Sequence, residues 1–279
     1  MRNRRGPTPP ASSPIYVHIL PAPLRHTRTD AAIKPTMPVA GNHEACGGCP
    51  ANAIDPDSAG NFSEYRARMH SVALHSNSGN NIYYSFERGL THFLVFSAEA
   101  YLYARNAAFL ANQLAFMKAD LAGVDRARTP WVVALVHKDY SMEGEAFAAF
   151  APLLNAGGVD LLFCGHIHFY MRNAPYDSVA GKADSASVSA DTHTYTEPKF
   201  MVSIVSGSSR DHEDDHKCPP TLASPSLQCS QNYGYGFFEA VNATTATWFY
   251  KTVRADGPGP QTFNDSLVIV QHNHRASTL

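Results

Sequence analysis

The sequence lacks three features that would place it in a specialised class of protein. No apolar run approaches the roughly 20 residues that a membrane-spanning helix needs. No basic stripe suggests a nucleic-acid partner, since 22 Lys and Arg face 24 Asp and Glu and the formal net charge is −2. The cysteine count is odd, five in 279 residues, which does not describe a closed disulfide framework. We therefore expect a soluble globular protein, with neither a membrane nor a nucleic-acid partner and with room for one sizeable core.

The cysteines leave their pairing open. Cys46-Gly-Gly-Cys49 has the spacing of a redox or zinc pair, but neither a thioredoxin-like helix start nor a second ligand pair accompanies it. A local disulfide or two free thiols is the favoured interpretation. Cys218 and Cys229 flank a Pro/Ser-rich loop, which a disulfide between them would staple. Cys164 ends an apolar run, so we predict that it is a buried small residue.

Residues 1–36 differ in composition from the rest of the chain. They carry six basic residues against one acid, Asp30, and prolines recur throughout. Pro14, Pro21 and Pro23 interrupt any apolar core after the basic start, so no signal peptide is recognisable. We interpret these residues as a disordered or non-homologous N-terminal extension, and a transit peptide stays open as an alternative.

From about Met37, strand and helix signals alternate. A hairpin is predicted at 81–86 and 91–97, where β-rich segments flank Arg88-Gly89, and helices are predicted at about 106–122 and 143–156. On the first helix Leu110, Leu114, Met117 and Leu121 share one face. Uninterrupted apolar segments at 131–136 and 160–164 are typical of strands buried on both faces. This alternation predicts an α/β fold with a mainly parallel central sheet.

After about residue 176 the helix signals fade. Residues 177–197 and 209–232 are polar and are predicted to be loops, and strands are predicted at 199–206, 236–241, 244–253 and 266–271. We divide the chain into the extension 1–36, a core 37–176 and a C-terminal β-rich part, 177–279, of the same domain.

Three apolar segments stop abruptly at side chains that bind metals. One ends in Gly41-Asn42-His43-Glu44, the second in His137, and the third in Gly165-His166-Ile167-His168. Each pattern alone is compatible with surface histidines. Because the carboxyl ends of parallel strands meet at one sheet edge, the three together predict a shared site. One amide and three imidazoles would offer neutral donors to Zn, Fe or Mn.

These three segments, in this order, resemble the calcineurin-like metallophosphoesterase superfamily. Tyr140, the Met142-Glu-Gly-Glu145 segment and Phe169-Tyr-Met-Arg172 resemble purple acid phosphatases in particular, and the resemblance covers about residues 33–255. It implies a layered α/β/β/α sandwich, here incomplete at its N-terminal edge. It also implies the hydrolysis of phosphate monoesters at acidic pH by a binuclear metal centre, which holds Fe together with Zn, Mn or Fe.

The resemblance also implies roles for individual residues. Asn42, His137 and His166 match the ligands of the second, divalent metal, and His168 matches the histidine on the first metal. His43 matches the histidine beside the phosphate that stabilises or protonates the leaving group. Two metals would lower the pKa of a shared water and clamp the phosphoryl oxygens.

Two earlier motifs of that family, GDxG and GDxxY, have no counterpart, since the sequence contains no Gly-Asp dipeptide. The N-terminal β-sandwich domain of the family is not recognisable either. We therefore expect at most one divalent metal and impaired hydrolysis. The alternatives are another phosphoesterase of the superfamily, such as a diesterase or pyrophosphatase, and an inactive fragment or degenerate homologue. His212 and His216 lie in a polar stretch that we predict to be a solvated loop.

The sequence does not determine the cellular compartment. The resemblance implies a secreted or a vacuolar or lysosomal enzyme. Three glycosylation sequons, at Asn61, Asn242 and Asn264, agree with a glycoprotein but are expected by chance in so Asn- and Ser-rich a chain.

Overall fold

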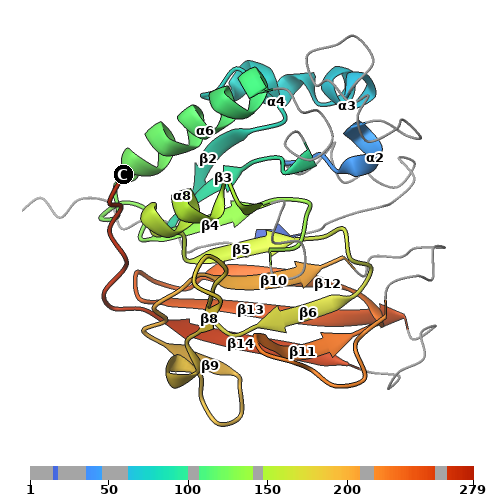
Figure 1. The fold of residues 1–279 in the computed structure, drawn as a ribbon, viewed down its shortest axis with the longest axis vertical. Coiled ribbons are helices and arrows are strands. Elements are labelled where there is room, and N and C mark those ends of the chain that lie inside the picture. The colour runs from blue at the N-terminus through green and yellow to red at the C-terminus, as the bar shows by residue number, and fades with distance from the viewer. Residues whose placement is uncertain are drawn as a thin grey trace, which may run out of the picture.

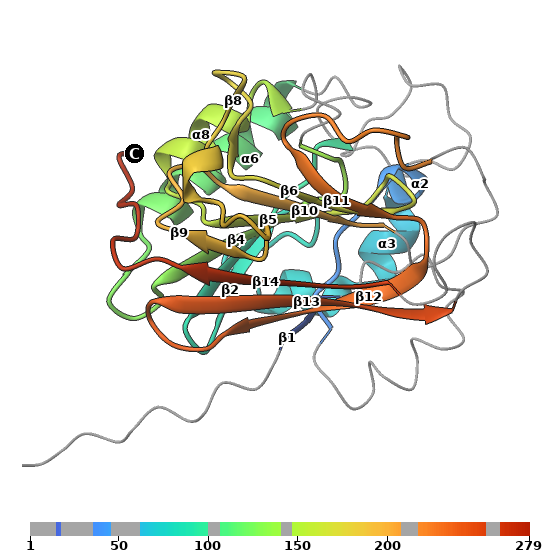
Figure 2. The same cartoon turned by 90° about the horizontal axis from the view of Figure 1, so that it is seen from below.

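The computed structural model describes residues 15–17, 36–45, 62–99, 107–140, 147–207, 217–254 and 263–279. Two β-sheets pack face to face, and helices α6 and α8 lie on the far side of the larger one (Figures 1 and 2). The larger sheet has the strand order β11-β6-β10-β5-β4-β3-β2, and the smaller has the order β1-β12-β13-β14-β9. The predicted α/β class is confirmed.

The larger sheet is parallel at its centre. Strands β3, β4, β5 and β10 are parallel neighbours, and β2, β6 and β11 pair antiparallel at its two sides. The carboxyl ends of β4 and β5 therefore lie side by side at one edge. The bounds are β2 Tyr84–Arg88, β3 Thr91–Val95, β4 Trp131–Leu135, β5 Leu161–Cys164, β6 Tyr170–Asn173, β10 Val202–Ser206 and β11 Ser226–Ser230.

The hairpin between β2 and β3 confirms the first strand prediction. Gly89 lies in its turn at a φ of 57°, a left-handed conformation that glycine adopts without a steric penalty. The apolar segments predicted at 131–136 and 160–164 are likewise strands, and every residue of β4 and β5 is buried.

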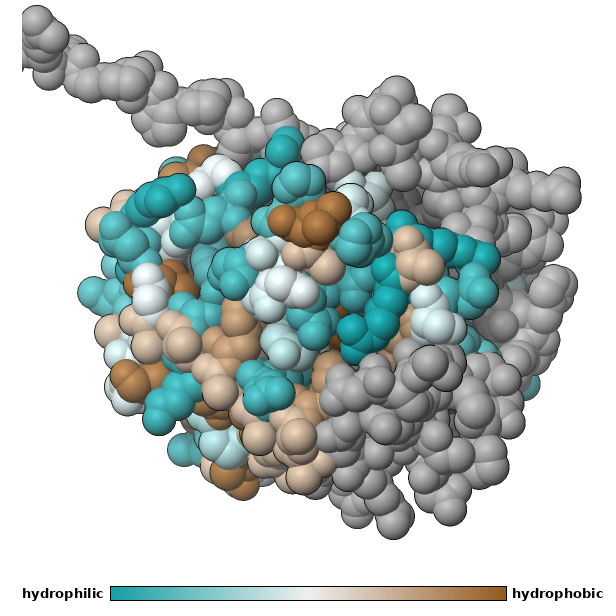
Figure 3. Space-filling view, turned by 90° about the horizontal axis from the view of Figure 1, so that it is seen from above, coloured by the Kyte–Doolittle hydropathy of each residue, from teal (hydrophilic) through white to brown (hydrophobic). Residues whose placement is uncertain are grey.

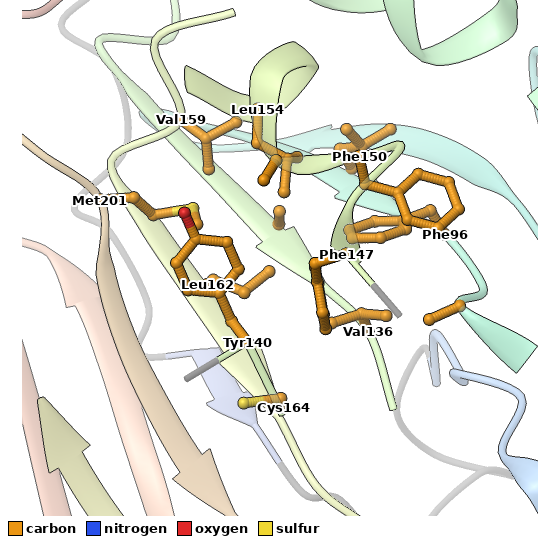
Figure 4. Close-up of a cluster of buried hydrophobic side chains, with 14 of the residues drawn as sticks. Phe96, Val136, Tyr140, Phe147, Phe150, Leu154, Val159, Leu162, Cys164 and Met201 are labelled. Atoms are coloured by element: carbon orange, nitrogen blue, oxygen red, sulfur yellow. The ribbon is translucent and has the colours of Figure 1, made fainter. Parts of the chain in front are cut away.

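The two faces of β4 and β5 contribute to two separate cores. Trp131, Val133 and Phe163 pack between the sheets. Val132 and Leu162, one residue along in each strand, pack against the helices. Figure 4 shows this helix-side cluster, with Leu162 near Tyr140, Phe147 and Leu154. Because side chains alternate across a strand, a continuous apolar run is what a strand between two cores requires.

Helix α6 spans Ala107–Ala122, close to its predicted range. Leu110, Leu114, Met117 and Leu121 all pack on the helix-side core, as their shared face predicted, although Leu110 and Leu114 are only partly buried. Gln113 is buried as well. Its amide accepts from the Ser97 backbone N–H at 2.9 Å and donates to the Ser97 carbonyl at 3.0 Å, so a polar residue is satisfied in the core.

The second predicted helix, 143–156, is only partly confirmed. Within the described residues it is α8, Ala151–Ala156, and a turn at 147–150 precedes it. Pro152 lies in the first turn of α8, where the missing N–H costs no hydrogen bond. Residues 141–146 lie outside the described ranges. Phe147, Phe150 and Leu154 are buried.

The smaller sheet includes the three closing strands that the sequence predicted. Its bounds are β1 Ile15–Val17, β9 Thr194–Thr196, β12 Tyr233–Ala240, β13 Thr245–Arg254 and β14 Asn264–Val270. Strand β1 is a correction, because no strand was expected within residues 1–36. It pairs antiparallel with β12 at the edge of this sheet. The remainder of the predicted extension, up to residue 35, lies outside the described residues.

The two predicted loops also contain strands. Residues 177–197 include part of the β7–β8 hairpin (Tyr176–Asp177 and Lys182–Ala183), the short helix η1 (Ser185–Ser187) and β9, and residues 209–232 include β11. The sequence missed β9 and β11 because their stability comes from pairing with β14 and β6, not from local propensity.

The cysteine predictions are confirmed where the structure describes them. Cys218 and Cys229 form a disulfide, which ties the preceding segment to β11. Cys164 is buried and is not part of a disulfide. The Cys46–Cys49 pair, and likewise His212 and His216, lie outside the described residues.

Three short helices complete the described fold: α2 Asn42–Ala45, α3 Ser63–Arg68 and α4 His70–His75. No described helix is long and apolar enough to cross a membrane. Seen from the side of α4 and α6, apolar residues are scattered among hydrophilic ones (Figure 3). Within the described ranges, the exposed large apolar residues are Met37, Leu74, Val179, Leu222, Val241 and Phe249.

Candidate functional site

Two adjacent strand exits form the base of the site. Strand β4 continues through Val136 to His137, and β5 continues through Gly165 to His166. The backbone ladder extends past both strands, since Val136 N–H donates to the Phe163 carbonyl at 3.1 Å and Gly165 N–H donates to the His137 carbonyl at 3.0 Å. His137 and His166 are therefore held next to each other by main-chain hydrogen bonds.

His166 has an unusual backbone conformation. Its φ is +59°, in the left-handed region that non-glycine residues seldom adopt. The turn is tight on both sides, since Ile167 N–H donates to the Gly165 carbonyl at 2.6 Å and Phe169 N–H donates to the Ile167 carbonyl at 2.8 Å. Gly207, after β10, packs directly against this turn. A Cβ at that position would lie 2.0 Å from the Ile167 carbonyl oxygen. Strain of this kind is concentrated at functional sites.

Asn42 reaches the site from the start of α2. The Glu44 carboxylate accepts from the Gly41 N–H at 2.9 Å, which satisfies a donor at the helix entrance. Further back, the Tyr84 hydroxyl donates to the Pro38 carbonyl at 2.6 Å and ties this segment to β2.

Three donor atoms converge at one point. Asn42 Oδ1 lies 2.8 Å from His137 Nε2, and His166 Nδ1 lies 3.2 Å from the same nitrogen. The two imidazole rings meet nearly edge to face, with centroids 5.0 Å apart. Around a tetrahedral zinc ion with bonds of about 2.0–2.1 Å, ligand atoms stand roughly 3.3 Å apart. The His137–His166 spacing is close to this value, and the Asn42–His137 spacing is shorter than it.

The electrostatics favour a neutral imidazole at the centre of this group. Burial, followed by the neighbouring charges of His166 and Lys138, lowers the pKa of His137 to about 3. At neutral pH the His137 ring therefore carries no charge, which is the protonation state that binds a metal. A neutral N and O donor set of this kind suits a borderline divalent ion.

The other two predicted residues lie beside this group. His43 is exposed on α2, next to Asn42, and His168 is half-buried two residues beyond His166. Both are close enough that a positive charge on either lowers the pKa of His137. Among the described residues, no group of three or more His, Cys, Asp or Glu side chains is arranged to hold a metal. The side-chain contacts that define the site are those of His137 with Asn42 and with His166.

Lys138 belongs to the site, and the sequence analysis did not predict it. Its Nζ lies 2.8 Å from His166 Nε2, and the residue is only 3% exposed. The sequence signal that could have indicated this residue is a lysine directly after a histidine at a strand end. The next residue, Asp139, is also buried and accepts a weak hydrogen bond from the Cys164 thiol at 3.5 Å.

The chain matches known proteins over most of its length. The sequence profile of the calcineurin-like phosphoesterases matches residues 14–170. Purple acid phosphatase 18 of Arabidopsis thaliana is 30% identical over 239 residues, which cover 82% of this chain and 48% of that protein. Purple acid phosphatase 23 of the same plant is 37% identical over 147 residues, covering 50% and 29% respectively. An acid phosphatase of Aspergillus ficuum is 25% identical over 266 residues, covering 79% and 42%.

The chain spans about half the length, or less, of these relatives. Among solved structures, the purple acid phosphatase PPD1 from yellow lupin seeds superposes with a TM-score of 0.60 at 22% identity, over 83% of this chain and 40% of that one. This likeness confirms the metallophosphoesterase fold. Together with the matched profile, it confirms the resemblance drawn from the sequence: the chain belongs to the calcineurin-like phosphoesterase family and is related to the purple acid phosphatases.

Proposed function

We propose that the chain is a metal-dependent phosphate monoester hydrolase of the acid phosphatase type, with its metal held by Asn42, His137 and His166. The observation that carries the proposal is that His137 Nε2 lies 2.8 Å from Asn42 Oδ1 and 3.2 Å from His166 Nδ1. The names of the relatives support the reaction class.

The donor set supports one divalent ion. An amide oxygen and two neutral imidazoles suit Zn²⁺, Mn²⁺ or Fe²⁺, whereas Fe³⁺ favours hard anionic oxygens. The first metal of a binuclear centre would need further ligands, of which His168 is the proposed one. When bound, a divalent ion polarises a phosphoryl oxygen and lowers the pKa of a coordinated water. Because these three donors hold one ion, and a second ion that would complete the clamp on the phosphoryl oxygens has no identified carboxylate ligand, we propose that hydrolysis by residues 1–279 is slow.

His43 is the proposed catalytic residue. It lies on the solvent side of α2, adjacent to Asn42, where an ester oxygen would leave. A protonated imidazole there would donate a proton or a hydrogen bond to the departing alkoxide. Because a protonated ring is required, we expect activity to favour acidic pH.

An oxidising compartment is part of this proposal. Disulfides persist in secreted and vacuolar proteins and are rare in reducing compartments, and Cys218 and Cys229 are paired. The sequon residues Asn242 and Asn264 are both exposed, so a glycosylating enzyme would reach them.

The test combines metal analysis with turnover. The purified chain is stripped with a chelator, titrated with Zn²⁺ or Mn²⁺, and assayed with an aryl phosphate between about pH 4 and 8. We expect one equivalent of metal and slow, metal-dependent hydrolysis, both lost in Asn42→Ala and His137→Ala and both kept in His75→Ala, an exposed histidine on α4. Metal binding without hydrolysis would refute the enzyme assignment. Binding that survives in His137→Ala would refute the site.

A further inference from the structure

Asn42 is held in the site by a different kind of contact from the two histidines. His137 and His166 follow hydrogen-bonded strands, and the backbone ladder continues past the ends of both strands. Residues 36–41, which lead to Asn42, belong to no strand within the described ranges. The position of Asn42 relative to His137 therefore has to be fixed by contacts other than a sheet ladder.

Two tyrosine hydroxyls converge on one carbonyl oxygen of this segment. Tyr84, on β2, donates to the Pro38 carbonyl at 2.6 Å, and Tyr65, on α3, donates to the same oxygen at 3.1 Å. A carbonyl oxygen has two lone pairs and can accept both hydrogen bonds. Both phenols are buried, and burial raises the pKa of each well above its usual value, so both keep the proton that they donate. We call these two hydroxyls the tyrosine clamp.

The tyrosine clamp lies close to Asn42 along the chain. Ala40, two residues beyond Pro38, is fully buried, and so is Ala45, in one cluster with the Tyr65 ring. The helices that carry Asn42 and Tyr65, α2 and α3, lie side by side in both ribbon views (Figures 1 and 2). Because buried residues flank Asn42 on both sides, a displacement of the Pro38 carbonyl would be passed on to Asn42.

The tyrosine clamp is also tied to the strand that leads to His137. Tyr84 is paired with Val95 of β3, and Val95 is paired with Leu135 of β4. Leu135 lies two residues before His137, so Tyr84 belongs to the same row across the sheet as this strand end. The Tyr84 hydroxyl therefore fixes the Pro38 carbonyl relative to the strand end from which His137 follows.

We propose that Tyr65 and Tyr84 are positioning residues of the metal site: by holding the Pro38 carbonyl, they set Asn42 where it can share a metal ion with His137. This inference rests on the proposed metal site. The tyrosines act through the backbone and supply no ligand themselves. Loss of the tyrosine clamp should therefore weaken metal binding although every ligand side chain is still present.

Phenylalanine substitutions test the proposal, because they remove the hydroxyls and keep the rings. We expect calorimetric titration with Zn²⁺ to give an affinity about 10–100-fold lower in the double variant Tyr65→Phe/Tyr84→Phe, as is typical when groups that orient metal ligands are lost. Tyr84→Phe alone should lose more affinity than Tyr65→Phe alone, because its hydrogen bond is the shorter one. The visible spectrum of bound Co²⁺, which depends on the arrangement of its ligands, should change in the double variant.

Tyr250→Phe is the matched control. The Tyr250 hydroxyl is also buried and donates to a backbone carbonyl, that of Asn232, at 2.7 Å, but it belongs to β13 of the smaller sheet. Urea unfolding should show a similar loss of stability in Tyr250→Phe and Tyr84→Phe. The control should keep the wild-type Zn²⁺ affinity and Co²⁺ spectrum, which a merely structural role of Tyr84 would leave unchanged as well.

A wild-type Zn²⁺ affinity in the folded double variant would overturn the proposal, and so would an equal loss of affinity in Tyr250→Phe. If the double variant does not fold, an unchanged affinity in folded Tyr84→Phe overturns it in the same way. Failure of the metal site itself is distinguishable, because the wild-type protein would then bind no Zn²⁺, or His137→Ala would bind it as tightly as the wild type. In that case both proposals fail.

Discussion

Gly41 lies directly against the ring of His137. A Cβ built on Gly41 would come within 2.9 Å of His137 Cε1 and within 3.0 Å of both ring nitrogens. The nearest atoms belong to a ring that is itself fixed by Asn42 and buried beside His166, so it has little room to retreat. The absence of a side chain at this position is thus a requirement of the site.

Gly41→Ala should therefore displace the His137 ring. We expect a Zn²⁺ affinity at least about tenfold lower, since misplaced ligands cost binding, with a stability loss of only about 1–3 kcal/mol. Gly123→Ala is the matched control, because its Cβ would meet nothing closer than 3.4 Å. Calorimetric metal titration and urea unfolding measure the two effects. Undiminished metal affinity in Gly41→Ala would show that the ring position does not matter.

The left-handed backbone at His166 predicts a reversed order of stability for two substitutions. Elsewhere in a strand or helix, glycine is less stable than alanine. At a φ of +59° a Cβ is strained, so His166→Gly should be more stable than His166→Ala by about 1–2 kcal/mol. Both variants should lose the metal. Urea unfolding of the two metal-free proteins checks this, and the ordinary order, with alanine more stable, would argue against the strained turn.

A buried ion pair joins the two sheets. Arg172 on β6 donates to Asp265 on β14 through Nε at 2.6 Å and Nη2 at 2.9 Å, and both side chains are almost fully buried. The Tyr170 hydroxyl donates to the same carboxylate at 2.5 Å. Since Asp265→Ala would leave a buried cation unpaired, we expect a loss of about 3–5 kcal/mol in the free energy of unfolding.

The control for this pair is the exposed ion pair between Glu64 and Arg68 on α3. Glu64→Ala should cost no more than about 0.5 kcal/mol, because water screens that pair. Denaturant unfolding of both variants gives the comparison. Equal losses at the two positions would show that burial of the Arg172–Asp265 pair is unimportant.

Asp160 predicts a pH dependence of stability. Burial raises the pKa of this carboxyl, but the His274 ring 3.8 Å away and the charges of Arg126 and Arg275 outweigh burial, so the pKa lies below its usual value. Arg126 donates to the carboxylate at 2.6 Å and the Val132 N–H donates at 2.8 Å. The folded state therefore holds the ionised form more strongly than the unfolded state does.

It follows that the contribution of Asp160 is complete above the unfolded pKa of about 3.9 and is lost as the pH falls through the lower folded pKa. Asp160→Asn should lower the stability by about 1–3 kcal/mol at pH 6, and the difference from wild type should shrink below about pH 4. Urea unfolding across this range measures it. A difference that is independent of pH would contradict the role of the charge.

The division between ligand and catalyst can also be tested. His43→Ala should keep its metal but slow hydrolysis by about 10²–10⁴-fold, as expected when an acid–base group is lost. His166→Ala should lose metal and activity together. Metal analysis alongside single-substrate kinetics separates the two, and equal metal loss in both variants would remove the distinction.

Much of the framework was predictable because its signals are local. The uninterrupted apolar runs of β4 and β5, the Gly89 turn and the segments that end in Asn42, His137 and His166 are each visible in a few consecutive residues. Convergence at one edge also followed, since parallel strands must end on the same side. The elements that were missed, β1, β9 and β11, are short and gain their hydrogen bonds from distant strands.

The sequence by itself determined which side chains follow the strand ends and in what order. The alternation of burial along a strand and the positions of glycines can both be read from adjacent residues. Only the tertiary structure decided which of them touch. The contact between Lys138 and His166 joins residues 28 apart, and it depends on the left-handed turn at His166 and on the closeness of Gly207 to Ile167. The burial of Gln113 on α6 was likewise decided by its contact with the Ser97 backbone. Contacts of this kind depend on side-chain directions across separate elements, which no local pattern encodes.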